Sequence, residues 1–205
     1  MRNKLTVALA GGALATGAFV GQASAQQFPA DTGNFNYNYV EGGVAFVDLD
    51  AGDQDLVGPV VRGSTAFHPN VFANAEFSYL TDDVDITTFR VGPGARMEVT
   101  PAFDVYGMLR VAYQDEDLPS PLGSTDDTGY DVTVGFRSDV APAFEVGGEI
   151  RYTDIDDFDD STDFILRGLY EMTPQAELLG ELHALEHDDD VFEDFGALVG
   201  ARYNF

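Results

Sequence analysis

Residues 128–140 read TGYDVTVGFRSDV. Every second position from Tyr130 is apolar as far as Phe136, whereas Asp131 and Arg137 belong to the alternate set. Successive side chains of a β-strand point to opposite faces, so a period of two is the pattern of a strand. The stretch therefore predicts a strand with one apolar and one polar face.

The same alternation recurs in blocks of about ten residues, which is the repeat of a membrane β-barrel. Two kinds of connection alternate between the blocks. Four are short and carry a proline, at Pro69, Pro101, Pro142 and Pro174, and five are rich in aspartate, at 50–55, 81–85, 115–127, 154–161 and 187–191. Nine connections imply ten strands, at 35–49, 56–68, 71–80, 86–99, 103–114, 128–140, 144–154, 162–172, 176–186 and 193–205. We therefore predict an all-β fold, an up-and-down antiparallel transmembrane β-barrel of about ten strands.

Arginine placement favours a barrel with a polar interior over a soluble β-sandwich, which would bury its apolar face instead. All eight arginines after residue 25 fall on the polar set of their strands. An arginine facing lipid costs roughly 2–4 kcal/mol at the membrane midplane, which explains the exclusion. Aromatic residues extend the pattern, with Phe67, Phe103, Phe144 and Phe205 beside the proline turns and Tyr79, Tyr113, Tyr130 and Tyr152 near the aspartate-rich loops.

The first strand is irregular, because Tyr37 and Tyr39 do not belong to the same set as Val40 and Val44. Either a bulge or a strand that begins nearer Tyr39 accounts for the mismatch.

The first 25 residues have the features of a secretory signal peptide. Arg2 and Lys4 precede an apolar run, and Ala23-Ser24-Ala25 matches a cleavage site. We expect export, cleavage near Ala25, a short periplasmic segment at 26–34 and a barrel at 35–205. The proline turns should then face the periplasm and the acidic loops the outside of the cell.

The chain is strongly acidic, with 36 Asp and Glu against 10 Lys and Arg. Nucleic acid is excluded as a partner, since phosphate binding needs clustered basic residues. We interpret the acidity as adaptation to a salty environment, and we expect weak association of divalent cations with the acidic loops. No spacing matches an EF-hand, so the sequence predicts no dedicated metal site and no cofactor.

The segment Tyr37 to Gly43, which reads YNYVEGG, resembles small bacterial outer-membrane barrels with an OmpA-like or opacity-type transmembrane domain. Terminal Phe205, with Tyr203 on the same face, is similar to the C-terminal signal that the barrel-assembly machinery recognises in such proteins. The resemblance implies insertion into the outer membrane, among its lipids and lipopolysaccharide. It also makes eight strands the alternative count.

Opposite charges on neighbouring strands predict an ion-pair network in the lumen, formed by Glu41, Arg62, Glu76, Arg90, Arg96, Arg110, Arg137, Glu149, Arg151, Arg167, Glu181 and Arg202. Glu76 should lie between Arg62 and Arg90 or Arg96, Glu149 between Arg137 and Arg167, and Glu181 between Arg167 and Arg202. Across the barrel seam, we expect Glu41 to meet Arg202.

A plugged barrel with a structural or surface-interaction role is the leading functional interpretation, because about ten strands leave little continuous water. A narrow cation-preferring channel is the alternative. A remote third interpretation is an omptin-like outer-membrane protease, because omptins place Asp and His near the extracellular rim. The candidate residues here are Asp82, Asp83 and Asp85 in one loop and His183, His187 and Asp188 at another. No motif specifies a nucleophile or a base, so we expect no catalytic residues.

Overall fold

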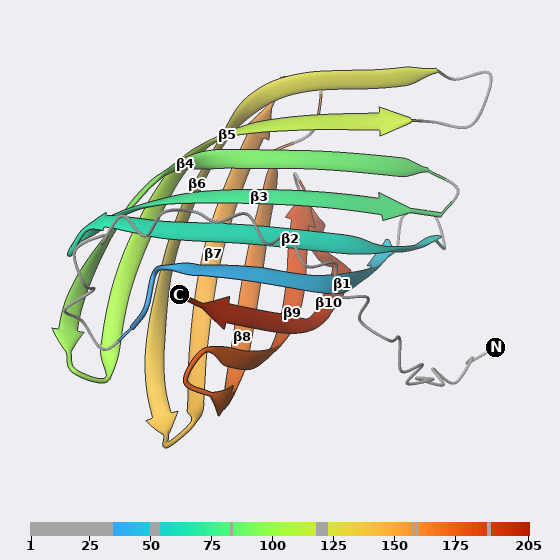
Figure 1. Cartoon of the computed structure of the whole chain (residues 1–205). Helices are drawn as coiled ribbons and strands as arrows, with labels where there is room; N and C mark the ends of the chain where they lie inside the picture. The colour runs from blue at the N-terminus through green and yellow to red at the C-terminus, as the bar shows by residue number, and fades with distance from the viewer. Residues whose placement is uncertain are drawn as a thin grey trace, which may run out of the picture.

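A computed structural model of the chain describes residues 35–205 apart from 50–53, 83, 118–122, 157, 159 and 188–189. Ten strands occupy the described residues: β1 (Tyr39–Leu49), β2 (Gln54–His68), β3 (Val71–Thr81), β4 (Asp85–Thr100), β5 (Phe103–Asp117), β6 (Ser124–Ala141), β7 (Phe144–Ile155), β8 (Ser161–Thr173), β9 (Ala176–His187) and β10 (Asp190–Asn204). Each strand pairs antiparallel with its neighbours in sequence, and β1 pairs with β10 to close the barrel (Figure 1). The predicted ten-stranded barrel is confirmed, and the alternative count of eight strands is wrong. The expected signal peptide and the segment 26–34 lie outside the described residues.

One end of the barrel, the turn end, carries four two-residue turns that each contain a proline. Proline suits the second position of a β-turn, because its ring holds φ near the required value. The register shifts beside each turn and leaves one residue of the preceding strand without a partner on the facing strand. These bulged residues are all apolar and exposed on the outer face: Phe67, Val99, Val140 and Met172. The opposite end, the loop end, carries the aspartate-rich connections.

The outer face is apolar along every strand. Val61, Leu109 and Val134, for example, are 47%, 56% and 63% exposed. A surface this apolar would drive association in water, whereas in a bilayer it meets hydrocarbon. Phe144 near the turn end and Tyr130 near the loop end are also exposed, so aromatic side chains stand at both rims of the apolar band.

β1 begins at Tyr39 and pairs with both neighbours without a register shift. The strand therefore starts at Tyr39, as the second explanation proposed, and this accounts for Tyr37. Tyr39 itself lies in the strand and faces the lumen, buried under the Arg202 guanidinium. The residues before it, 35–38, enter the barrel at the turn end, where Phe35 and Tyr37 are buried against Phe72 and Tyr106.

The barrel is narrow. Its pairing registers, followed once around the ten strands, amount to a shear of about 12 residues, which corresponds to strands tilted by roughly 35–45°. Eight strands enclose a space that side chains just fill, so ten strands with long inward side chains leave little room. Within the described residues, no helix has the length and apolarity needed to cross a membrane.

Candidate functional site: the charged lumen

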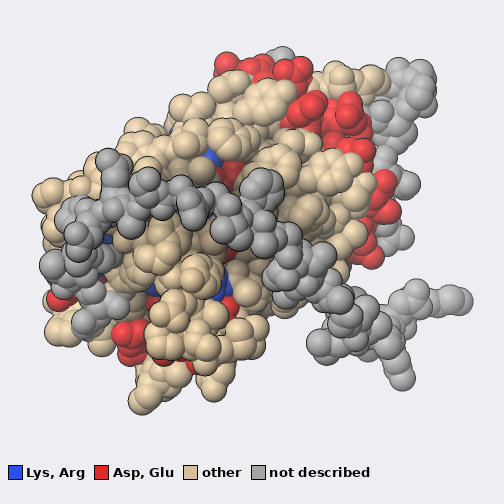
Figure 2. Space-filling view, in the orientation of Figure 1, with Lys and Arg blue, Asp and Glu red and all other residues tan. Residues whose placement is uncertain are grey.

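The structure places all twelve of the expected network residues inside the barrel, eleven of them buried and Arg90 partly buried. Their inward direction follows from strand geometry, since each belongs to the set of positions opposite the apolar outer face. Figure 2 shows the consequence for the visible surface: blue Lys and Arg atoms are scarcely seen, whereas red carboxylates gather near the loop end.

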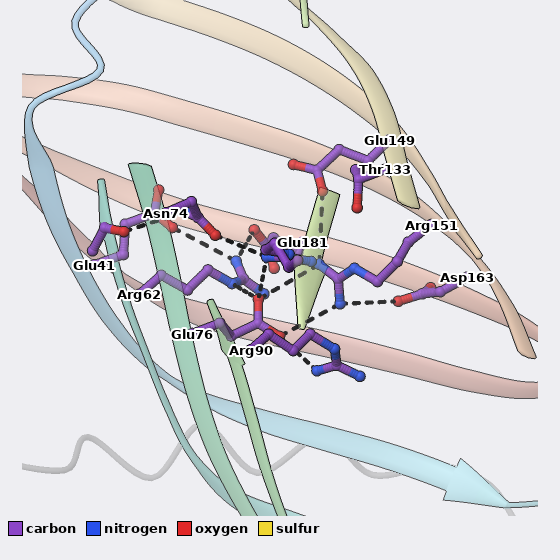
Figure 3. A network of polar contacts seen from close by, with 12 residues as sticks. Glu41, Arg62, Asn74, Glu76, Arg90, Thr133, Glu149, Arg151, Asp163 and Glu181 are labelled. Atoms are coloured by element: carbon purple, nitrogen blue, oxygen red, sulfur yellow. Dashed lines mark hydrogen bonds and ion pairs between the residues drawn. The ribbon is translucent and has the colours of Figure 1, made fainter. Parts of the chain in front are cut away.

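Glu76 on β3 is the centre of the network (Figure 3). It lies directly opposite Arg62 on β2 and Arg90 on β4. Arg62 Nε donates to Glu76 Oε2 at 2.7 Å, and Arg90 Nη1 donates to Oε1 at 2.8 Å. Arg151 on β7 reaches the same carboxylate from across the barrel, with both Nη atoms 3.5 Å from its oxygens. Charged hydrogen bonds of this kind are about twice as strong as neutral ones.

Two further contacts cross the lumen. Arg62 Nη1 donates to Glu181 Oε1 on β9 at 2.6 Å, although β1 and β10 separate these strands. Arg167 Nη1 on β8 lies 3.7 Å from Glu41 Oε1 on β1. Together with the pairs between adjacent strands, these contacts form a continuous layer of ionised side chains across the barrel.

The seam contains the expected pair. Glu41 lies opposite Arg202 in the register of β1 and β10, and Arg202 Nε donates to Glu41 Oε1 at 2.7 Å. Arg202 Nη2 contacts the same oxygen, and the guanidinium also lies 4.2 Å from the centre of the Tyr39 ring. Arg202 is only 1% exposed, so the pair is shielded from water.

Three arginines form ion pairs with carboxylates other than those expected. Arg137 forms two hydrogen bonds of 2.8 Å with Glu145 rather than pairing with Glu149. Its Nη1 also donates to the carbonyl of Asn36, which draws the side chain toward the turn end. Arg202 lies opposite Glu177, not Glu181, on β9, and Arg96 pairs with Asp104 instead of Glu76. The height along the strand decides the partner of Arg202 and of Arg96. Arg137 lies opposite Gly147, midway between Glu145 and Glu149, so its contact with residue 36 decides there.

Sequence reasoning missed several lumen carboxylates and polar partners, namely Asn74, Asp104, Tyr106, Asp131, Glu145, Asp163 and Glu177. Asp131 accepts from Arg110 Nε at 3.0 Å, and Arg110 Nη1 donates to Asn74 at 2.8 Å. The Tyr106 hydroxyl donates to Glu149 at 2.6 Å. The sequence did indicate the pair of Arg110 and Asp131. Asp131 belongs to the polar set of its strand, and the register of the hairpin places it opposite Arg110.

Residues 35–38 close the lumen at the turn end. Arg96 Nη1 donates to the carbonyl of Phe35 at 3.0 Å. The Arg96 and Arg137 guanidinium groups lie 4.8 Å and 4.9 Å from the centre of the Tyr37 ring, within the range of cation–π attraction. Asn38 Oδ1 accepts from the backbone N–H of Ala66 at 2.8 Å. The segment is therefore held by both its backbone and its side chains.

Cavities lie on both sides of the charged layer. On the loop side, a space of about 230 Å³ is lined by apolar residues such as Leu56, Val60 and Leu198, with Arg62 and Glu76 beneath. At the turn end, a space of about 530 Å³ is lined by Phe35, Arg137, Glu145 and others. The network and residues 35–38 lie between them.

Of the six residues named for the protease interpretation, the structure describes the side chains of Asp82, Asp85 and His183. His183 lies inside the barrel, with Nδ1 2.9 Å from Asp163 and Nε2 3.3 Å from Glu181. Asp83 and Asp188 are outside the described residues. Among the residues that are described, no group of three or more His, Cys, Asp or Glu is arranged to hold a metal ion.

Solved structures share the architecture. The NanC porin aligns with a TM-score of 0.51 and 8% identity, covering 82% of this chain and 99% of its own. The KdgM porin has a TM-score of 0.47 and 12% identity, with 81% and 99% coverage. Ail from Yersinia pestis has a TM-score of 0.40 and 14% identity, with 82% and 95% coverage. The chain spans 57% of the length of an anion-selective porin from Comamonas acidovorans. At 8% identity, the alignment with the NanC porin shows a shared fold alone.

No curated protein sequence matches the chain significantly. A family model does, and it describes an outer membrane protein beta-barrel domain. Its match extends over residues 11–170, which is more than half of the chain, and the closed ten-stranded barrel agrees with it. The chain therefore belongs to the outer membrane protein β-barrel domain family, and its place is the outer membrane.

Proposed function

We propose that this protein is a structural or surface-interaction protein of the outer membrane whose lumen is closed to solutes. The observation that carries the proposal is the ion-pair layer that crosses the lumen, from Arg62 to Glu181 and from Arg151 to Glu76. Side chains from separate walls of the barrel meet there, and their contacts support a lumen that is closed at that level.

The energetics of buried charge support a permanent closure. Removing one partner of a buried ion pair costs roughly 3–5 kcal/mol, because the other charge is left unpaired in a medium of low polarity. A solute passing the layer would have to separate several such pairs at once. Residues 35–38 add a second closure at the turn end, held by Arg96 and Arg137.

In this proposal the turn end faces the periplasm and the acidic loop end faces the outside. Asp48, Asp55, Asp82 and Asp126 are exposed at the loop end, which suits weak association with divalent cations near the charged headgroups of lipopolysaccharide. The exposed rings of Tyr203 and Phe205 suit recognition by the assembly machinery during insertion. Export with cleavage near Ala25 belongs to the same proposal, as does the absence of catalysis.

Conductance tests the closure. Folded wild-type protein in planar lipid bilayers should show no steady openings. A variant with Arg62→Ser, Arg151→Ser, Arg96→Ser and Arg137→Ser should show them, because it lacks the cross-lumen contacts of Arg62 and Arg151 and the two arginines that hold residues 35–38 at the turn end. Folding of both proteins can be verified by the shift in gel mobility on heating. Steady openings of the wild type would contradict the proposal.

The alternative is a narrow cation-preferring channel, and the carboxylates around the loop end favour it. Charged rings at a pore mouth select ions of the opposite sign. Wild-type openings with a reversal potential set by the cation gradient would support this alternative over the closed barrel.

A further inference from the structure

A small cavity lies within the charged layer, apart from the two larger spaces. Its volume is about 20 Å³, and six arginines line it: Arg62, Arg110, Arg137, Arg151, Arg167 and Arg202. The carboxylates in its lining are Glu76 and Glu149. A cavity holds one water-sized species once its volume exceeds about 10–15 Å³.

The cavity is rich in hydrogen-bond donors. Each guanidinium has five N–H groups and no acceptor, and two carboxylates cannot accept from all six arginines. Other carboxylates, such as Asp131 behind Arg110, take up part of this capacity on the far side of the guanidinium groups. Arginine N–H groups therefore outnumber the carboxylate oxygens in the lining.

Five buried guanidinium nitrogens of the lining arginines have no hydrogen-bond partner, and neither does one carboxylate oxygen of the lining, Glu149 Oε2. The three nitrogens on Arg167 and Arg202 lie in ion pairs, whereas Arg110 Nη2 and Arg151 Nε do not. Both side chains are deeply buried, Arg110 at 2% exposure and Arg151 at 5%. Arg151 is held loosely, since its Nη atoms lie 3.5–3.9 Å from Glu76, Glu149 and Asp163. A buried donor without a partner keeps the full cost of its desolvation, so an acceptor in the cavity would be strongly favoured.

We propose that this cavity is a binding site for one small monovalent anion of the size of chloride. A water molecule would bring two further O–H donors to a place already rich in them, whereas a halide only accepts. The cavity is small, at about 20 Å³, which favours a monatomic anion over a polyatomic one. The site does not depend on whether the barrel conducts, because its anion is enclosed by the network.

Anion-dependent stability is the first test. Urea-induced unfolding of the full barrel in detergent is compared in sodium chloride and in sodium gluconate at equal ionic strength. A ligand that binds only the folded state raises the apparent folding constant about 100-fold at one hundred times its dissociation constant. Chloride should therefore shift the unfolding midpoint to higher urea, and gluconate should not.

Matched variants separate the site from a general salt effect. Arg110→Lys keeps the charge beside Asp131 but removes Nη2, so the difference between chloride and gluconate should disappear. Arg90→Lys makes the same chemical change at a residue that contacts Glu76 and Asp131 but does not line the cavity, and it should retain the difference. Equal anion dependence in both variants would overturn the proposal.

A second measurement holds even if Arg110→Lys fails to fold. Crystals of the wild-type protein grown or soaked in sodium bromide should give an anomalous peak between Arg110 and Arg151. A water molecule in that position without bromide signal, together with equal stability in chloride and gluconate, would refute the site. Neither result depends on conductance, so the proposal of a closed lumen is tested separately by the bilayer experiment.

Discussion

At the scale of single residues, one of the four proline turns contains a residue in an unfavourable backbone conformation. Ala143, which follows Pro142, is the one non-glycine residue in the described part of the chain with a left-handed backbone, at φ 67°. An L-residue pays about 1–2 kcal/mol for this conformation, whereas glycine adopts it freely. Ala143→Gly should therefore stabilise the barrel by roughly 0.5–1 kcal/mol, measured by urea unfolding in detergent.

The control for this substitution is Ala102→Gly, in the equivalent turn after Pro101, where φ is not positive. Glycine there only adds freedom to the unfolded chain and should destabilise by about 0.5 kcal/mol. Equal effects of the two substitutions would show that the conformation of Ala143 carries no strain.

At the scale of the strands, the seam between β1 and β10 depends on the Glu41–Arg202 pair. Glu41→Gln or Arg202→Gln alone should destabilise by about 3 kcal/mol, because each leaves a buried charge without its partner. The double variant should cost less than the sum of the two, by roughly 0.5–3 kcal/mol of coupling. Unfolding free energies of the four proteins complete this double-mutant cycle.

A second cycle with Glu41→Gln and Arg96→Gln provides the comparison, because Arg96 contacts Asp104 and the carbonyls of Phe35 and Pro69 at the turn end, none of which Glu41 contacts. These two changes should add within about 0.5 kcal/mol. Strict additivity in the seam cycle as well would mean that Glu41 and Arg202 are each solvated independently.

At the scale of the whole molecule, the orientation in the membrane can be tested cleanly because the chain has no cysteine. A cysteine at Ser124, exposed at the loop end, should react with a membrane-impermeant thiol reagent on intact cells. Cysteines at Asn70 or Gln175, in the proline turns, should react only after the outer membrane is permeabilised. Labelling of the turn positions on intact cells would invert the proposed orientation.

The ten strands, their approximate ends and their polar faces could all be predicted from the sequence, because strand periodicity and turn chemistry are local. The pair across the seam was predictable too. Glu41 and Arg202 lie near the ends of strands that must meet if the barrel closes, and the structure places them opposite each other.

The contacts across the lumen were decided only by the tertiary structure. Periodicity tells which face a side chain occupies, but not which residue stands at the same height on the far wall. That height depends on the shear, summed over ten registers, and on the reach of long arginine side chains. Hence Arg62 meets Glu181, and Arg137 turns to Glu145 because residues 35–38 enter the barrel beside it. The sequence by itself determined a barrel with charges inside, and closure of the sheet determined how those charges meet.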